Sequence, residues 1–260
     1  MGTQLRVTLV QSHLHWENPV ANRDYFTQCL DQLDAPTNLI VLPEMFTTGF
    51  SMNAQPFAEA MDGPTLTWMQ TMAKQHQVAI TGSIMIAEEG KFYNRLVFVF
   101  PNGTYQTYDK RHCFTLAGEE KVFTAGTTHT LINYKGFTIC PLICYDLRFP
   151  VWARNSLNYD LLLYVANWPK ARTNAWDALL KARAIENMAY CIGVNRVGLD
   201  GLGYEYIGHS AVYDPLGNQM PTPNFEAPFV HTISLDKEQM LQTRKKLGFL
   251  NDQDAFNLLV

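Results

Sequence analysis

Three polar residues with complementary chemistry follow apolar, strand-like segments that lie far apart in the chain. Glu44 closes NLIVLPE (38–44), Lys110 closes TYQTYDK (104–110) and Cys144 closes FTICPLIC (137–144). Ligands of open α/β sheets bind beyond the carboxyl ends of the strands, where the loops leave a crevice. The side chains are separated by 66 residues (110 minus 44) and 34 residues (144 minus 110), yet we expect them to meet in one cleft.

A thiol, an amine and a carboxylate in one cleft could carry out nucleophilic catalysis. A cysteine attacks as the thiolate, and its pKa falls beside a cation or a helix N-terminus. Lys110 would supply the cation, and a helix that we expect to begin near Phe149 would supply the N-terminus. Glu44 would take the thiol proton and pass it to the leaving group, a role worth about 10²- to 10⁴-fold in rate.

Each of these residues also has an ordinary structural interpretation. A cysteine at the end of an apolar strand is most often a buried packing residue, and we assign Cys29, Cys140 and Cys191 to that class. A lysine in a sequence such as YDKRH is usually a solvated hairpin residue. Glu44 is harder to explain in this way, because a carboxylate that closes a buried strand needs a partner or water.

Two other kinds of site are weaker alternatives. Cys140 and Cys144 lack the two-residue spacing of a zinc pair and no second pair exists, which argues against zinc. His13 and His15 alternate along one strand edge and could bind a metal, but no third ligand is evident. His112 leaves open a Cys–His pair of the papain kind.

Composition limits the class of protein. The 260 residues are 47% hydrophobic and 17% charged, as in a globular chain with a large core. The net charge of −4, with no basic stripe, argues against a nucleic-acid partner. Five cysteines without a regular framework suggest reduced thiols in a reducing compartment. The longest apolar runs are of strand length, short of the roughly 20 residues of a membrane span. We therefore expect a cytoplasmic protein without a membrane partner.

The elements that must position these residues alternate between strands and helices, with hairpins among them. We predict one domain over residues 1–260 of class α/β, with two mixed sheets packed face to face and helices outside, because a plain doubly wound fold would contain fewer hairpins. Strands are expected at 6–11, 38–44, 78–86, 160–168 and 191–197, hairpins at 92–112 and 130–144, and two final strands around a PLG turn in 208–218 and 227–236. Helices are expected at 18–33, 63–77, 149–157, 174–190 and 236–246.

Several segments of the chain resemble a known family. LPEMF around Glu44, YDKRHCF around Lys110 and ICYDLRFP around Cys144 are similar to the three catalytic motifs of the nitrilase superfamily, the carbon–nitrogen hydrolases. The segments GEEKVFTAG, VANWP, ARAIENMAYCIGVNRVG and GHSAVYDPLG look like further family blocks in the same order. The similarity covers essentially the whole chain and is greatest to bacterial omega-amidases.

The resemblance implies an αββα sandwich that a homodimer extends. It implies Glu44 as general base and acid, Lys110 as the charge that stabilises the tetrahedral intermediate, and Cys144 as the nucleophile. It also implies a second glutamate after the lysine, which Glu119 fits and the adjacent Glu120 leaves open. One departure is a cysteine at position 113, where relatives usually carry leucine.

A thioester mechanism follows from the resemblance. The oxyanion would form against Lys110 and the backbone N–H of Tyr145, and one such donor is typically worth about 10²- to 10³-fold in rate. No metal or organic cofactor would be needed. The expected substrates are small amides, 2-oxoglutaramate and 2-oxosuccinamate, which carry a carboxylate at the far end.

The sequence evidence for the residues that would bind such a substrate is weaker. Arg172 is our first candidate for the carboxylate and Arg148 the second, although Arg148 could instead pair with Asp146. Trp168 and Phe46, together with the Tyr145 ring, are expected to wall the pocket. Arg183 and Glu186 stand three residues apart on a helix and are expected to form an ion pair there or at a dimer interface.

Two other functions stay open at this point. One is an amidase of the same superfamily for another substrate, such as deaminated glutathione, an N-carbamoyl amino acid or a nitrile. The other is a catalytically inactive relative that serves as a binding or scaffold protein, against which the intact Glu–Lys–Cys set argues.

Overall fold

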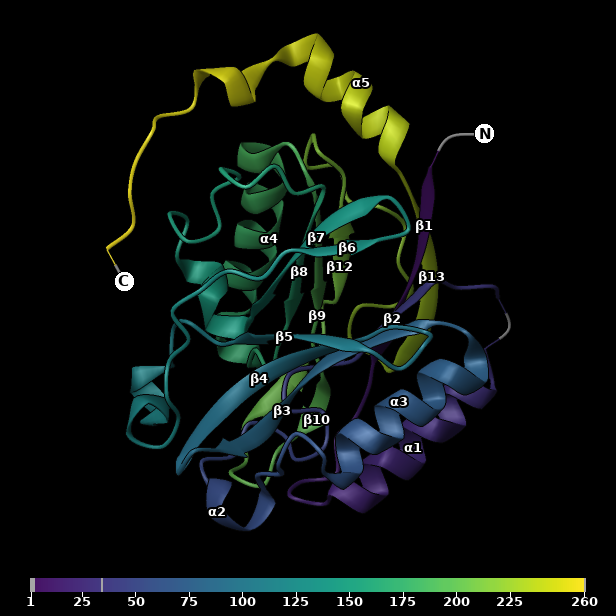
Figure 1. The fold of residues 1–260 in the computed structure, drawn as a ribbon, viewed down its shortest axis with the longest axis vertical. Coiled ribbons are helices and arrows are strands. Elements are labelled where there is room, and N and C mark those ends of the chain that lie inside the picture. Colours follow the sequence, from purple (N-terminus) through teal and green to yellow (C-terminus); the bar gives the residue numbers. More distant parts are fainter. Residues whose placement is uncertain (1–2, 34, 260) are drawn as a thin grey trace.

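Two mixed β-sheets form the centre of the molecule (Figure 1). The computed structural model describes residues 3–33 and 35–259. The six-stranded sheet has the order β13 (Phe229–Asp236), β1 (Gln4–Gln11), β2 (Leu39–Val41), β3 (Ala79–Glu88), β4 (Lys91–Val99) and β5 (Tyr105–Asp109). The five-stranded sheet has the order β12 (Ala211–Tyr213), β9 (Tyr190–Val194), β8 (Leu161–Val165), β7 (Phe137–Ile143) and β6 (Ile132–Tyr134).

Parallel strands occupy the middle of both sheets and antiparallel strands the edges. β1, β2 and β3 run parallel, as do β7, β8 and β9. Strands of this kind are buried on both faces, which explains the continuous apolar runs LIV and LLLYV. One hydrophobic cluster contains side chains from both sheets, such as Leu96 of β4 and Ile139 of β7, so the main core lies between the sheets.

Helices cover the outer faces. α1 (Pro19–Asp31) and α3 (Pro64–His76) pack on the first sheet through a second cluster that includes Phe26 and Met69. α4 (Thr173–Asn187) covers the second sheet, where Trp176 and Leu180 occupy the space that a side chain at Gly193 would need. The prediction of two mixed sheets between helices is confirmed.

The remaining helical segments are short or peripheral. α5 (Lys237–Leu247) and the C-terminal segment form an arch along one end of the molecule (Figure 1). The others are α2 (Ala54–Phe57) and the single-turn 3₁₀ segments η1 (Thr115–Ala117), η2 (Glu119–Lys121), η3 (Cys144–Arg148), η4 (Lys170–Arg172) and η5 (Phe249–Asp252). Within the described residues, no helix is both long and apolar enough to cross a membrane.

Several predicted elements differ from the structure. The helix predicted at 149–157 is wrong: η3 begins at Cys144 itself, and the following loop is held by side-chain bonds from Asn155 to Tyr159 and Asn187. β2 ends at Val41, so Glu44 lies three residues beyond it in a turn. The PLG turn does not join two paired strands, because β12 pairs with β9 and β13 with β1 in the other sheet.

One small sheet was missed. β10 (Val197–Leu199) and β11 (Glu205–Ile207) form an antiparallel pair outside the two large sheets. Each strand has only three residues, too few for an alternating pattern to be visible in sequence.

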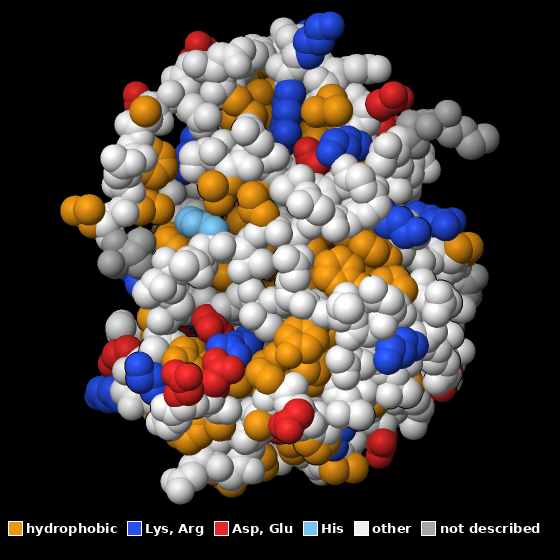
Figure 2. All heavy atoms as spheres, in the orientation of Figure 1, with side chains coloured by type: hydrophobic (Ala, Val, Ile, Leu, Met, Phe, Trp, Pro, Cys, Tyr) orange, Lys and Arg blue, Asp and Glu red, His pale blue; other side chains and the backbone are white. Residues whose placement is uncertain are grey.

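Charged side chains are spread over the surface. The face shown in Figure 2 carries Lys and Arg in small groups mixed with Asp and Glu, with hydrophobic side chains between them. That distribution agrees with the modest net charge of −4.

Candidate active site

Loops at the carboxyl ends of β2, β5 and β7 bring the three predicted residues together. The Nζ atom of Lys110 lies 2.9 Å from Oε1 of Glu44. The Cys144 thiol lies close enough to both groups for each to shift its pKa. Glu44 and Lys110 are almost fully buried, whereas Cys144 retains 9% exposure at the base of a pocket.

A second carboxylate also contacts Lys110, and it belongs to Glu119. The Lys110 Nζ atom lies 3.0 and 2.9 Å from the two carboxylate oxygens of Glu119. Glu119 is buried in η2, and the backbone N–H of Phe114 donates to its Oε2 at 2.5 Å. The adjacent Glu120 is exposed. The geometry therefore selects Glu119 from the two glutamates that the sequence left open.

Burial and charge act against each other in this cluster. Burial disfavours the charged form of Lys110, but the carboxylates of Glu119 and Glu44 outweigh it and hold the pKa of Lys110 well above its usual value. For Glu119, burial has the largest effect and raises its pKa, although the Lys110 charge opposes the rise. Lys110 is therefore a permanent cation within the site.

Cys144 stands on a strained turn between β7 and η3. Its φ angle of 43° lies in the left-handed region, which a residue with a side chain occupies only when its surroundings impose it. The Asp146 carboxylate imposes the turn by accepting hydrogen bonds from the backbone N–H of Ile143 at 3.0 Å and of His112 at 2.9 Å. Such an elbow exposes the Cys144 side chain at the rim of the sheet, the position that a nucleophile occupies on comparable turns.

Two sequence alternatives are wrong, because Asp146 already has other partners. His112 pairs through Nδ1 with Asp146 at 2.7 Å and stacks on Phe149, so it does not form a Cys–His pair with Cys144. The Tyr108 hydroxyl donates to the other Asp146 oxygen at 2.8 Å. Within the described residues, Asp146 forms no ion pair with Arg148.

The resting state of the thiol differs from the expectation. Burial raises the pKa of Cys144 well above its usual value, the Glu44 carboxylate adds to the rise, and Lys110 opposes it. The sequence argument weighed only the lysine and a helix N-terminus. A thiol in these surroundings would need a neighbouring base to become a thiolate, and the Glu44 carboxylate lies next to it.

Two asparagines that sequence reasoning missed complete the cluster. Asn94 of β4 donates through Nδ2 to Oε1 of Glu44 at 2.8 Å and to Oε1 of Glu119 at 3.2 Å. The backbone N–H of Asn167 donates to Oε2 of Glu44 at 2.8 Å, and its backbone oxygen lies 3.9 Å from the Cys144 sulfur. A signal was present for Asn94, since an asparagine interrupts the apolar pattern of FYNRLVFV.

The pocket above Cys144 has a volume of about 330 Å³, and aromatic, aliphatic and charged side chains all line it. Trp168 lines it as predicted, and so do Phe50 and Phe114. The Phe50 ring centroid lies 5.0 Å from Nζ of Lys110, so this ring contacts both the buried cation and the pocket.

Phe46, predicted as a further wall, does not line the pocket. It is fully buried on the helix side of the first sheet, with the rings of Phe26 and Trp68 at 5.5 and 5.8 Å. The chain turns after Glu44, and this turn sends Phe46 into the outer core while the carboxylate points inward.

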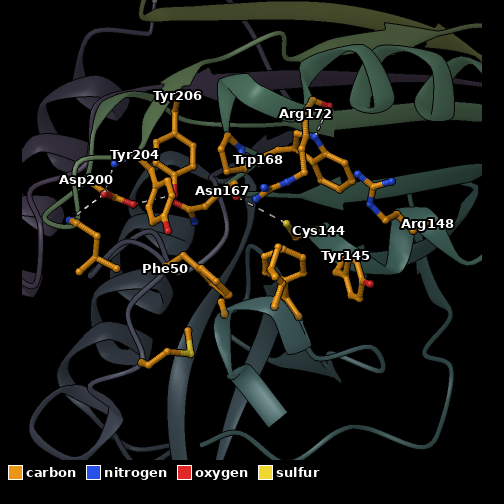
Figure 3. A pocket seen from close by; sticks show the side chains of 16 residues that line it. Phe50, Cys144, Tyr145, Arg148, Asn167, Trp168, Arg172, Asp200, Tyr204 and Tyr206 are labelled. Atoms are coloured by element: carbon orange, nitrogen blue, oxygen red, sulfur yellow. Dashed lines mark hydrogen bonds between the residues drawn. The ribbon is translucent and has the colours of Figure 1, made fainter. Parts of the chain in front are cut away.

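Both predicted arginines lie on one wall of the pocket, opposite Asp200 (Figure 3). The Arg148 guanidinium lies 4.9 Å from the Trp168 ring centroid, and that of Arg172 lies 5.1 Å from the Phe114 ring centroid. In the part of the chain that the structure describes, neither guanidinium forms an ion pair. Asp200 is occupied by the Tyr206 hydroxyl at 2.9 Å and two backbone N–H groups.

Tyr145 is the second residue of η3, and nothing in residues 3–33 and 35–259 accepts a hydrogen bond from its backbone N–H. The Tyr145 ring lines the pocket.

Arg183 donates to Glu186 at 2.8 Å, which is the ion pair predicted within the helix. His13 and His15 follow β1 as loop residues, and the described residues contain no cluster of three or more groups able to hold a metal ion.

Several known proteins are similar to this chain in sequence and in fold. The carbon–nitrogen hydrolase family model matches residues 6–245. Omega-amidase YafV of Escherichia coli K12 is 42% identical over 254 residues, 98% of either chain. The 2-oxoglutaramate amidase of Bacillus subtilis is 28% identical over 251 residues, 95% of this chain and 96% of that relative. XC1258 of Xanthomonas campestris, a CN-hydrolase superfamily protein whose crystal structure has an arsenic adduct in the active site, superposes with a TM-score of 0.95 at 42% identity, covering 98% of this chain and 99% of that one. This chain therefore belongs to the carbon–nitrogen hydrolase family, in the nitrilase superfamily.

Proposed function

We propose that this protein is an omega-amidase that hydrolyses 2-oxoglutaramate and 2-oxosuccinamate to the corresponding 2-oxo dicarboxylic acids and ammonia. The observation that carries the proposal is the pocket itself. It has a thiol with a neighbouring carboxylate and ammonium at its base, and on one wall two guanidinium groups that form no ion pair with any described residue. The similarity to relatives named omega-amidase and 2-oxoglutaramate amidase supports the same substrate class.

Acylation begins when Glu44 accepts the proton of the Cys144 thiol. The sulfur attacks the amide carbon, and the carbonyl electrons move to oxygen. This oxyanion is stabilised by the ammonium of Lys110 and the free backbone N–H of Tyr145. Glu44 then returns the proton to nitrogen, the C–N bond breaks, and ammonia leaves a thioester on Cys144.

Deacylation uses the same groups in reverse. Glu44 takes a proton from water, and the hydroxide adds to the thioester carbon. The C–S bond then breaks, Glu44 returns the proton to the sulfur, and the acid and the Cys144 thiol are released. Glu119 keeps Lys110 in place through its two carboxylate oxygens. Every step uses side chains of this chain, and we propose that no metal or organic cofactor participates.

The wall of the pocket that carries Arg148 and Arg172 accounts for the substrate class. A guanidinium binds a carboxylate through two parallel hydrogen bonds, and these are stronger than neutral ones. Stacking on Trp168 and Phe114 fixes the planes of Arg148 and Arg172 without using their donors. A small 2-oxo acid amide can therefore place its carboxylate on this wall while its carboxamide reaches Cys144.

We propose a homodimer in which α4 of each copy faces the other. Large apolar side chains are exposed around the end of this helix: Val151, Leu157, Ile185 and Leu216 are between 37% and 52% exposed. Groups of this kind on a soluble surface mark interaction sites. Sedimentation equilibrium should give twice the mass of one chain, and a mass of one chain would contradict the proposal.

The remaining features of the proposal concern organisation and location. We propose that residues 1–260 act as a single catalytic unit, since both sheets contribute to one site. We also propose a cytoplasmic location, because five cysteines remain free, among them the buried nucleophile. A small-molecule amide is then the partner, and neither nucleic acid nor a membrane is required.

Ammonia release from a substrate panel tests the function. The panel contains both 2-oxo acid amides, an N-carbamoyl amino acid, deaminated glutathione and a nitrile, each assayed with the wild type and Cys144→Ala. Hydrolysis of another member but not of the 2-oxo acid amides would overturn the substrate. No turnover, together with no mass adduct on Cys144, would favour a binding protein instead.

A further inference from the structure

Asn94 lies at the centre of the charged cluster and does not line the pocket. It is 1% exposed in β4, and its Nδ2 donates to both Glu44 and Glu119, at 2.8 and 3.2 Å. Its backbone oxygen accepts from the backbone N–H of Lys110 at 3.0 Å. We propose that Asn94 is a positioning residue, which holds the two carboxylates around Lys110 and leaves one oxygen of Glu44 for proton transfer. This inference rests on the proposed function of Glu44.

Counting donors shows why the cluster needs Asn94. The ammonium of Lys110 has three N–H donors, and its Nζ contacts Oε1 of Glu44 and both oxygens of Glu119. Two buried carboxylates, those of Glu44 and Glu119, thus share one cation. Because like charges around one site repel each other, the ionised form of each carboxylate disfavours that of the other. Asn94 contributes two further N–H groups without adding charge, so both carboxylates can stay ionised.

The two oxygens of Glu44 consequently have different surroundings. Oε1 accepts from Lys110 and from Asn94, which fills its two lone-pair sites. Among the described residues, Oε2 accepts only from the backbone N–H of Asn167, at 2.8 Å. Asn167 is also the residue whose carbonyl lies beside the Cys144 sulfur. The geometry therefore points to Oε2 as the oxygen that receives the thiol proton.

The orientation of the Asn94 amide follows from its partners. Ionised carboxylates only accept hydrogen bonds, so Nδ2 must face them. The amide oxygen Oδ1 is then buried without a hydrogen-bond partner in the described part of the chain. A buried carbonyl oxygen without a hydrogen-bond donor costs free energy. We therefore expect Asn94 to act through its N–H₂ group, which donates to the two carboxylates.

A removed donor should matter most when the carboxylates are charged. The titratable groups facing Asn94 and its partners are Glu44, Lys110, Glu119, Cys144 and Cys113, the last with its pKa raised by burial to about 11. Without the Asn94 donor, the protonated carboxyl form gains relative to the ionised form. Loss of stability should therefore grow as pH rises through the carboxyl range, whereas lost packing would cost the same at every pH.

Asn94→Ala and Asn94→Asp test the inference, with Thr81→Val as the matched control. Thr81 is a buried polar residue of the neighbouring strand β3 and donates to the backbone of β4, but it lies outside the site. For Asn94→Ala we expect kcat to fall by about 10- to 100-fold with KM little changed, because the lost bonds are to charged groups outside the pocket. The acid limb of kcat/KM should move up by about one pH unit.

Asn94→Asp keeps the shape but adds a third carboxylate. It should be stable at low pH, where the new group is protonated and can donate, and lose both stability and activity as pH rises. Thermal unfolding measured between about pH 5 and about pH 8 reports this without any substrate. Thr81→Val should show a constant difference from the wild type.

The outcomes separate the two proposals. A wild-type acid limb in Asn94→Ala, or unfolding differences independent of pH in both Asn94 variants, would overturn the role of Asn94 even if 2-oxoglutaramate is hydrolysed. If the wild type hydrolyses no amide, the proposed function fails, and the unfolding measurements still decide whether Asn94 supports the ionised carboxylates.

Discussion

Glu119 offers the sharpest test of the electrostatic arrangement. Its carboxylate contacts Lys110 through both oxygens and accepts the Phe114 backbone N–H at 2.5 Å, all in a fully buried environment. In Glu119→Gln the shape is kept and the charge is lost. In either orientation the N–H₂ end of the new amide must then face the Lys110 ammonium, together with either the Asn94 amide or the Phe114 N–H.

The magnitude follows from these contacts. A lost hydrogen bond to a charged group costs about 1.5–3 kcal/mol, and a donor left unsatisfied in the interior adds about 1–3 kcal/mol. Together they approach the roughly 3–5 kcal/mol measured when one partner of a buried ion pair is removed. If about 3 kcal/mol of this is lost from the transition state, kcat falls by about 10²-fold, at about 1.4 kcal/mol per tenfold.

The assay is ammonia release under saturating 2-oxoglutaramate, with thermal unfolding measured in parallel. Glu120→Gln is the matched control, because Glu120 is adjacent in sequence but exposed, and we expect its kcat to stay near that of the wild type. A Glu119→Gln enzyme that is folded and nearly as active as the wild type would refute the reasoning. A loss in Glu120→Gln alone would show that the wrong glutamate had been assigned.

Five further substitutions test other parts of the site. Cys144→Ala should abolish turnover and leave the melting temperature near that of the wild type, and residual turnover would require another nucleophile. Arg172→Met and Arg148→Met should each lower kcat/KM for 2-oxoglutaramate by about 10- to 100-fold, the worth of one charge-assisted bond, and leave an uncharged amide unaffected; an equal loss on both substrates would exclude a carboxylate-binding role. Glu44→Gln removes a negative charge that raises the pKa of the thiol, so iodoacetamide should modify Cys144 at lower pH than in the wild type while turnover is lost; an unchanged or higher alkylation midpoint would contradict the charge assignment. Asp146→Ala should destabilise the fold by about 3 kcal/mol or more, since several buried donors lose their acceptor, and an unchanged unfolding midpoint would show that the turn does not depend on it.

Local sequence patterns accounted for most of the fold. Continuous apolar runs marked the buried parallel strands, and Pro19 and Pro64 stand at the starts of α1 and α3. The failures occurred where side-chain contacts replace periodicity. The segment 149–157 was predicted as a short helix, yet hydrogen bonds between Asn155 and both Tyr159 and Asn187 hold it as a loop.

For the site, too, sequence patterns identified some residues and missed or misplaced others. Glu44, Lys110 and Cys144 were indicated by their residue types and by their positions at the ends of predicted strands. The resemblance to the nitrilase superfamily added the second glutamate. Phe46 was misplaced because sequence gives the residue that follows a strand, but not the direction in which a turn sends its side chain. Asn94 was missed because its importance depends on two carboxylates that other parts of the chain deliver.

By itself, the sequence determined the chemical inventory, the class of fold and the family, because these depend on residue types, periodicity and ordered motifs. The tertiary structure decided which carboxylates share the Lys110 ammonium, that His112 pairs with Asp146, and that burial raises the pKa of the Cys144 thiol. The physical reason is that burial and electrostatic interaction depend on distance in space. Groups tens of residues apart in the chain acquire their pKa values and hydrogen bonds only when the two sheets have packed together.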